Sequence, residues 1–220
     1  MIPAFLVRRS VQKFNVDNIN IKRGFIFIHI PKNAGSSVND ALKIHKGSHY
    51  TAAEYRAGLG WRYRLFFSFC FTRNPWSRFL SLYNFARMEE SYYHSAINPE
   101  KAKYGKHMDY DILKNASLND CAHLLLEGKL RHDKTWNHWR PQTSWVCDKE
   151  GKLIVDFTGK VENIDADFAY VTQKTGMNVS LPQVNASGEV HDYRKFYDPE
   201  TRDIVASCYA ADIEKFNYSF

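Results

Sequence analysis

The sequence has few cysteines, and no pattern would pair them or direct them to a metal ion. Its 220 residues include four, Cys70, Cys121, Cys147 and Cys208, and none belongs to a CxxC pair. Their spacings match neither a zinc ribbon nor a disulfide scaffold. We therefore expect free thiols in a reducing compartment and no metal centre.

Long apolar runs and long basic runs are also missing. The first ten residues, MIPAFLVRRS, hold too short an apolar stretch for a signal peptide or a membrane anchor. The formal net charge is +6, yet no five or six basic residues stand together. The missing run excludes a basic tail, and the net charge favours an anionic partner without identifying it. We do not expect nucleic acid to be that partner. We expect a cytoplasmic protein without a transmembrane segment.

No internal repeat, low-complexity tract or Gly/Ser-rich linker divides the chain. Hydrophobic residues make up 44% and charged residues 25%, the balance of an ordinary globular domain. The length is within the usual span of one α/β domain. We expect a single domain over residues 1–220, in which residues 1–22 form an N-terminal extension.

Apolar runs alternate with helical patterns along the chain. Strands are predicted at 24–30, 65–73 and 152–159, where the apolar residues are nearly continuous. Helices are predicted at 37–46, 74–90, 117–130 and 164–176, with one long terminal helix at 198–216. This alternation predicts an α/β fold with a largely parallel sheet and helices on both faces. Ligands of such folds bind at the carboxyl ends of the strands.

The first strand leads into HIPKNAGSS, residues 29–37. A turn of small residues before a helix presents backbone N–H groups and a positive helix end to an anion. Gly35 would allow close backbone approach, Ser36 and Ser37 would add hydroxyl donors, and Lys32 would add a point charge. The same motif alone also fits an ordinary tight turn with an exposed lysine.

A second cation follows the second strand. The stretch FTRNPWSRFLSLY places Arg73 at the strand end and Ser81 about two turns into the next helix. Two adjacent strand ends then each offer a cation and hydroxyls, as a doubly phosphorylated ligand requires. A nucleotide kinase would need a lysine late in its loop followed by serine or threonine, and no GKS or GKT tripeptide occurs.

As a pair, these motifs resemble the 5′-phosphosulfate-binding and 3′-phosphate-binding motifs of sulfotransferases. The donor of these enzymes is 3′-phosphoadenosine 5′-phosphosulfate (PAPS). The chain resembles the carbohydrate sulfotransferases of sulfotransferase family 2, which contains the heparan 2-O and chondroitin 4-O enzymes and bacterial relatives. The likeness begins near residue 23, runs to the end and includes RPQTSWV, residues 140–146. It implies a P-loop-like α/β fold without ATP hydrolysis.

The resemblance also implies roles for individual residues. Lys32 would contact the transferring sulfuryl group, residues 33–37 would hold the 5′-phosphate, and Arg73 with Ser81 would bind the 3′-phosphate. Arg194 and Lys195 follow a polar stretch that in the family tends to form a loop over the nucleotide. Many relatives carry threonine in place of Asn33 and Ser36, and the Asn33 side chain can still donate a hydrogen bond. The expected PAPS-binding residues are Lys32, Asn33, Ala34, Gly35, Ser36, Ser37, Arg73, Ser81, Arg194 and Lys195.

Transfer to a sugar hydroxyl requires a general base. His49 is the candidate, because it lies between the two nucleotide motifs, where relatives place a catalytic histidine. A helix-capping role for His49 is the alternative, and Glu54 is the rival base because other sulfotransferases use glutamate. His29, on the first strand, is interpreted as a core histidine. Basic residues that could contact an acidic glycan are Arg62, Arg64 and Arg140.

These observations predict a PAPS-dependent sulfotransferase that acts on a hydroxyl of a carbohydrate-type acceptor and releases 3′,5′-ADP without a metal ion. Two other functions stay open at this point. A P-loop-type nucleotide kinase or NTPase would also bind phosphates at a strand end. A non-catalytic polyanion-binding module would account for the net charge, although not for two matched anion sites.

Overall fold

The computed structural model describes residues 4–45, 47–131, 137–182 and 192–220. By its internal contacts the chain divides into two compact units, residues 1–73 with 142–188 and residues 74–141 with 189–220. A single domain over residues 1–220 stays a prediction.

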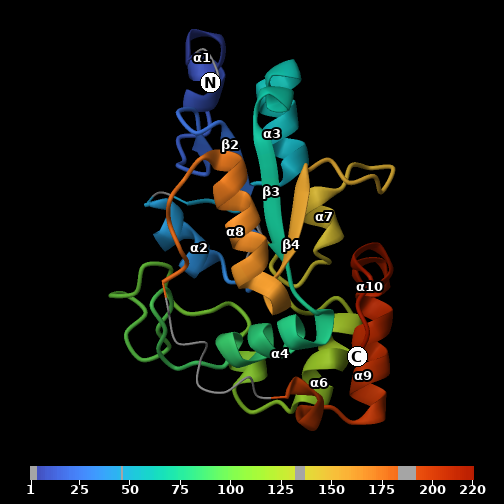
Figure 1. Cartoon of the computed structure of the whole chain (residues 1–220). Helices are drawn as coiled ribbons and strands as arrows, with labels where there is room; N and C mark the ends of the chain where they lie inside the picture. The colour runs from blue at the N-terminus through green and yellow to red at the C-terminus, as the bar shows by residue number, and fades with distance from the viewer. Residues whose placement is uncertain (1–3, 46, 132–136, 183–191) are drawn as a thin grey trace. The chain divides into compact units, whose positions relative to one another are not determined.

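A four-stranded sheet forms the centre of the first unit (Figure 1). Its strands, in spatial order, are β1 (Ile19–Asn20), β2 (Phe25–Ile28), β3 (Phe67–Thr72) and β4 (Phe157–Lys160). Strands β2, β3 and β4 are parallel to one another, whereas β1 pairs antiparallel with β2. The sheet is therefore mixed, and the prediction of a parallel sheet is wrong for its β1 edge.

Strand β1 lies within the expected N-terminal extension. Only four residues separate it from β2, and Gly24 in this connection has a φ of 71°. So short a connection can join only antiparallel neighbours, because a parallel pair needs a crossover of a dozen or more residues. Part of residues 1–22 thus belongs to the sheet.

The strand predicted at 152–159 begins only at Phe157. Leu153 instead forms an isolated antiparallel bridge with Cys147. The Asp156 carboxylate accepts hydrogen bonds of 2.7 Å from both the backbone N–H and the hydroxyl of Ser68. The apolar residues before Asp156 are therefore part of a connection rather than a strand.

Helices flank this sheet, which confirms the α/β class. Side chains of alternate strand residues lie on one face, where Phe27 and Phe69 pack with α2 (Gly35–Leu42) and α8 (Ile164–Thr175). Figure 1 shows α8 crossing in front of the strands. The alternate positions, among them Ile26 and Cys70, are also fully buried. The helices of this unit are α1 (Ala4–Gln12), α2 (Gly35–Leu42), α3 (Ala52–Leu59), η1 (Gly60–Leu65), α7 (Thr143–Val146), η2 (Val161–Asn163) and α8 (Ile164–Thr175).

Helix α2 ends earlier than predicted. Lys43 adopts a left-handed conformation, with φ 57°, and its N–H donates to the carbonyl of Asp40 at 3.2 Å. A left-handed residue after the last turn terminates a helix. His45, expected on this helix, consequently lies beyond it.

The second unit is helical where the structure describes it. Its elements are α4 (Pro75–Ala86), α5 (Tyr110–Leu113), α6 (Leu118–Leu126), η3 (Tyr193–Phe196), α9 (Pro199–Cys208) and α10 (Ala210–Phe216). The predicted start of α4 is confirmed: Asn74 Oδ1 accepts from the N–H of Trp76 at 3.1 Å, and Pro75 occupies the first turn.

The single terminal helix predicted at 198–216 is wrong. The backbone leaves the helical conformation at Tyr209, with φ −116° and ψ 25°, and separates α9 from α10. The ring of Tyr209 is buried, and its hydroxyl donates to the carbonyl of Trp139 at 2.7 Å. Trp139 lies in the same core, so the interruption coincides with a buried tertiary contact.

Candidate functional site

The connection from β2 to α2 forms a cradle of backbone N–H groups, residues 32–37. Lys32 and Ala34 have left-handed conformations, with φ 66° and 57°, whereas Asn33 between them does not. Such alternation turns successive N–H groups towards one concavity. No side chain caps α2, and the first N–H groups of a helix have no intrahelical partner. The cradle therefore suits an anion at the carboxyl end of β2.

The buried side chain of Asn33 fixes the middle of this cradle. Asn33 is 1% exposed, and Nδ2 donates to the carbonyl of Phe71 at 2.8 Å and to Oε1 of Gln142 at 2.7 Å. Both amide hydrogens thus bind protein oxygens. Any contribution of Asn33 to a bound phosphate would come from its backbone N–H rather than from its side chain.

Lys32 and Arg73 lie together at neighbouring strand ends. An Nη1 hydrogen of Arg73 is donated to the carbonyl oxygen of Lys32 over 3.4 Å. Burial, and secondly the charge of Arg73, lower the pKa of Lys32 from 10.5 to about 8. Two partly buried cations at one place repel each other, and an anion bound between or beside them would relieve that repulsion.

Gly35 is required by a neighbouring side chain rather than by its own backbone. A Cβ atom added to Gly35 would lie 1.8 Å from Nε2 of His29. The imidazole of His29, stacked on Phe27 with 5.6 Å between ring centroids, fills the space where any larger residue would project. Close backbone approach to an anion, which the sequence suggests for Gly35, stays a prediction. His29 thus supports the start of α2.

His49 lies beside His29, next to the cradle. The ring centroids are 4.3 Å apart, and Nδ1 of His49 is 2.9 Å from the carbonyl oxygen of His29. Because a carbonyl only accepts, Nδ1 carries the proton, and Nε2 is the accepting nitrogen of the neutral ring. Burial, and secondly the charge of His49, lower the pKa of His29 well below 6.5. His29 is consequently neutral at pH 7.

The segment that carries His49 is anchored to β2. Asn18 is fully buried; its Nδ2 donates to the carbonyl of Phe27 at 3.0 Å, and its Oδ1 accepts from the N–H of Ser48 at 2.8 Å. These bonds hold the residue before His49 against the strand. The structure therefore brings His49 to the carboxyl end of β2, where Lys32 and Gly35 also lie.

His49 does not cap a helix. Thr51 caps α3, and its hydroxyl accepts from the N–H of Glu54 at 3.1 Å. The carboxylate of Glu54 in turn accepts from the N–H and the hydroxyl of Thr51, at 2.7 and 2.8 Å. Such a capping box satisfies otherwise unpaired helix donors. Glu54, the rival base, thus has a structural task at the start of α3.

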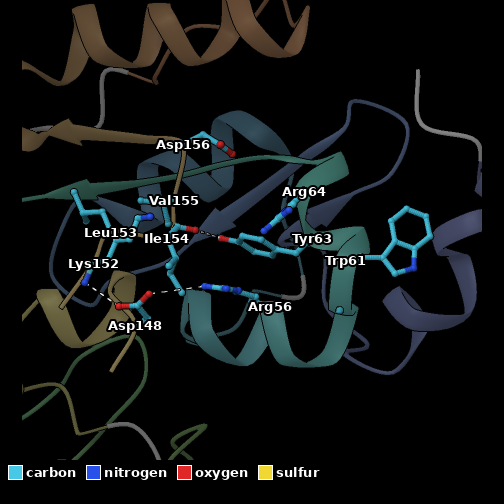
Figure 2. A pocket seen from close by; sticks show the side chains of 11 residues that line it. Arg56, Trp61, Tyr63, Arg64, Asp148, Lys152, Leu153, Ile154, Val155 and Asp156 are labelled. Atoms are coloured by element: carbon cyan, nitrogen blue, oxygen red, sulfur yellow. Dashed lines mark hydrogen bonds and ion pairs between the residues drawn. The ribbon is translucent and has the colours of Figure 1, made fainter. Parts of the chain in front are cut away.

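Arg62 and Arg64 lie away from the cradle. Both belong to η1, which precedes β3, whereas Arg73 follows the other end of that strand. Six residues of strand correspond to about 20 Å at ~3.3 Å per residue. Arg64 lines a groove of about 670 Å³ with Arg56 and Lys152 (Figure 2). The structure does not bring these two arginines to the cradle.

The other expected site residues belong to the second unit. Ser81 lies on α4, and the carbonyl of Arg140 accepts from Arg78 at 3.1 Å. Arg194 is exposed, pairs with Asp192 at 3.2 Å and lies over the ring of Tyr193. Lys195 is exposed beside it in η3. Residues 183–191, within the expected loop over the nucleotide, are outside the described residues. The nucleotide and glycan roles of this group stay predictions.

Gln142 was not recognised as a site residue from the sequence. Its side chain is fully buried, and its partners Arg73 and Asn33 are 69 and 109 positions away. No periodicity marks such a residue, although the stretch RPQTSWV was part of the family resemblance. His29 was interpreted only as a core histidine, although it directly follows β2 and precedes the cradle by three positions.

Three further properties of the described residues concern their thiols, metal binding and membrane insertion. The four cysteines are free thiols, and three of them are buried. Within the described ranges, no three His, Cys, Asp or Glu side chains gather where they could hold a metal ion. The helices of those same ranges include none that is both long and apolar enough to span a bilayer.

The chain was compared with known proteins. A family model described as "Sulfotransferase family" matches residues 18–219 and so covers nearly the whole chain. No curated protein and no solved structure matches it. The matched residues include the cradle, His49 and Arg73. The chain therefore belongs to the sulfotransferase family, whose members are enzymes that transfer sulfuryl groups.

Proposed function

We propose that this enzyme transfers a sulfuryl group from PAPS to a hydroxyl of a carbohydrate-type acceptor and releases 3′,5′-ADP. The observation that carries the proposal is the cradle at the end of β2, with Lys32 in it and Arg73 at the end of the neighbouring strand. A parallel strand, a cradle and a helix in this order also support a P-loop-like fold.

The residues present fit the donor. The uncapped start of α2 and the left-handed residues Lys32 and Ala34 suit a 5′-phosphate. The hydroxyls of Ser36 and Ser37 lie in the first turn of α2 and are not buried. Arg73 would bind the 3′-phosphate, with Ser81 of α4 as its proposed second donor. PAPS, when bound, supplies the sulfuryl group and a phosphate leaving group.

Lys32 would stabilise the charge that develops on the oxygen between phosphorus and sulfur. Sulfuryl transfer resembles phosphoryl transfer, in which positioning and charge stabilisation do most of the work. With a pKa of about 8, Lys32 carries its proton in about nine of ten molecules at pH 7. Its partial burial strengthens the interaction with a neighbouring anion.

His49 would accept the proton of the acceptor hydroxyl. Its Nδ1–H bond to the carbonyl of His29 leaves Nε2 as the basic nitrogen of the neutral ring. The same bond would hold the ring in place while the proton is transferred. We favour His49 over Glu54, because the carboxylate of Glu54 already accepts two hydrogen bonds in the cap of α3.

Thermal denaturation with three ligands tests this function against its rivals. A ligand present at a hundred times its dissociation constant stabilises a protein by about 2.7 kcal/mol. We expect this stabilisation with 3′,5′-ADP, and little with ATP plus magnesium or with an oligonucleotide. Stabilisation by ATP alone would indicate a kinase or NTPase, and by the oligonucleotide alone a polyanion-binding module.

The carbohydrate-type acceptor rests on the resemblance to glycan sulfotransferases and is tested separately. PAPS and a panel of neutral and acidic glycans would be incubated with the enzyme, and sulfated products would be detected by mass spectrometry. A His49→Ala enzyme serves as the matched control. Sulfation of phenols or steroids but of no glycan would contradict the proposed acceptor class while leaving the donor intact.

A further inference from the structure

Gln142 connects the two strand ends of the candidate site through one side chain. Its Oε1 accepts from Nδ2 of Asn33 at 2.7 Å and from the N–H of Arg73 at 2.9 Å. Its Nε2 donates to the carbonyl of Arg73 at 2.9 Å. A backbone N–H can only donate and a backbone carbonyl can only accept, so Arg73 determines the orientation of this amide. All three residues belong to the first unit.

The cradle needs such an anchor because its backbone is strained. Lys32 and Ala34 are side-chain-bearing residues in the left-handed region, on either side of Asn33. Such conformations persist where surrounding contacts enforce them, and they are frequent at ligand sites. The contacts of the Asn33 amide are the carbonyl of Phe71 and Oε1 of Gln142. The shape of the cradle thus depends on a side chain from a distant segment.

The position of Arg73 depends on the same side chain. Gln142 binds both the N–H and the carbonyl of Arg73, directly after β3 ends. The guanidinium reaches back to the carbonyl of Lys32. Lys32 and Arg73 are both cations and repel each other, so their charges cannot hold them together. A neutral, buried amide between the two segments supplies that connection.

We propose that Gln142 is a positioning residue that holds the cradle and Arg73 at a fixed separation, so that both anionic ends of one nucleotide are bound together. This inference rests on the proposed function and deepens it. The cradle would bind the 5′-phosphate and Arg73 would bind the 3′-phosphate. Gln142 would keep the separation between these two binding groups constant. A ligand with only one phosphate would gain much less from this alignment.

The test compares 3′,5′-ADP with 5′-AMP in three variants. Gln142→Leu removes every polar atom at similar size, and Gln142→Glu keeps the accepting oxygen but loses the donor to Arg73. Tyr63→Phe is the matched control, because it removes a hydroxyl that donates to the carbonyl of Ile154 at 2.9 Å (Figure 2). Tyr63 precedes β3, whereas Arg73 follows the other end of that strand. Calorimetry gives both affinities.

Gln142→Leu should lower the ratio of 3′,5′-ADP to 5′-AMP affinity about tenfold or more, because a misplaced charged contact to phosphate loses about that much affinity. Gln142→Glu should lower it less, and Tyr63→Phe should leave it unchanged. If both Gln142 variants keep the wild-type ratio, the positioning role is refuted. If Gln142→Leu does not fold, the ratio measured for Gln142→Glu decides: a wild-type value would refute the role.

Hydrogen exchange of the ligand-free protein separates this inference from the proposed function. Backbone amides of residues 32–37 and of Arg73 should exchange faster in both Gln142 variants than in the wild type or in Tyr63→Phe. If the wild type does not bind 3′,5′-ADP, the proposed function fails, whereas the exchange rates still decide whether Gln142 holds the two segments. Unchanged exchange at both segments would overturn the inference.

Discussion

Binding of 3′,5′-ADP should draw a proton onto Lys32 at alkaline pH. Burial, and secondly the charge of Arg73, hold the pKa of Lys32 at about 8 in the ligand-free enzyme. A bound phosphate favours the charged amine and therefore raises this pKa. Since binding and protonation promote each other, the affinity for 3′,5′-ADP should change little between about pH 6.5 and 7.5 and fall as the pH rises through about 8.

The size of the effect follows from the contact that Lys32 would make. A hydrogen bond between charged groups contributes about 1.5–3 kcal/mol, or about one to two pKa units. Lys32 would then titrate at about pH 9–10 in the complex. At about pH 8.5, the free enzyme holds this proton in about one quarter of molecules and the complex in most. Binding should take up about half to three quarters of a proton there, and about a tenth at pH 7.

Calorimetry at about pH 8.5 in two buffers of different ionisation enthalpy measures this uptake. The phosphates of the ligand lose their second proton at about pH 6 and do not contribute. Lys32→Arg is the matched control, because a guanidinium stays charged throughout this range. Its proton uptake should be near zero. Equal uptake in Lys32→Arg, or none in the wild type, would refute the placement of Lys32 beside the bound phosphate.

The other predictions concern three neighbouring positions. Arg73→Ala should weaken 3′,5′-ADP about ten- to hundredfold in calorimetry and 5′-AMP much less; equal losses would reject its 3′-phosphate role. His49→Ala should keep the 3′,5′-ADP affinity but lower turnover about 10²- to 10⁴-fold and remove the acidic limb of the pH–rate profile. If His49→Ala retains its activity and Glu54→Gln loses it, Glu54 is the base. Gly35→Ala should lower the melting temperature, because its methyl would lie 1.8 Å from Nε2 of His29 and overpacking costs about 1–3 kcal/mol; an unchanged Tm would contradict this packing.

The parts of the fold that depend on neighbouring residues could be predicted from the sequence. Continuous apolar runs located β2 and β3, and the helix predicted at 74–90 begins, as α4, at Pro75. The same local chemistry placed Lys32 and Arg73 at strand ends, because each follows its strand within a few residues. The interruption at Tyr209 and the antiparallel edge strand β1 were missed. Both depend on contacts that helical and strand periodicity do not encode.

By itself, the sequence determined which residues could form an anion-binding turn, because a strand, a short run of small residues and a helix start are local patterns. Only the tertiary structure decided what supports that turn. His29 explains why residue 35 is glycine, and Gln142 joins Asn33 to Arg73 across separations of 109 and 69 positions. The structure also placed Arg64 before the amino end of β3, whereas Arg73 follows the carboxyl end of that strand. Contacts between residues so far apart in the chain form only when the sheet assembles. Local sequence patterns do not encode them.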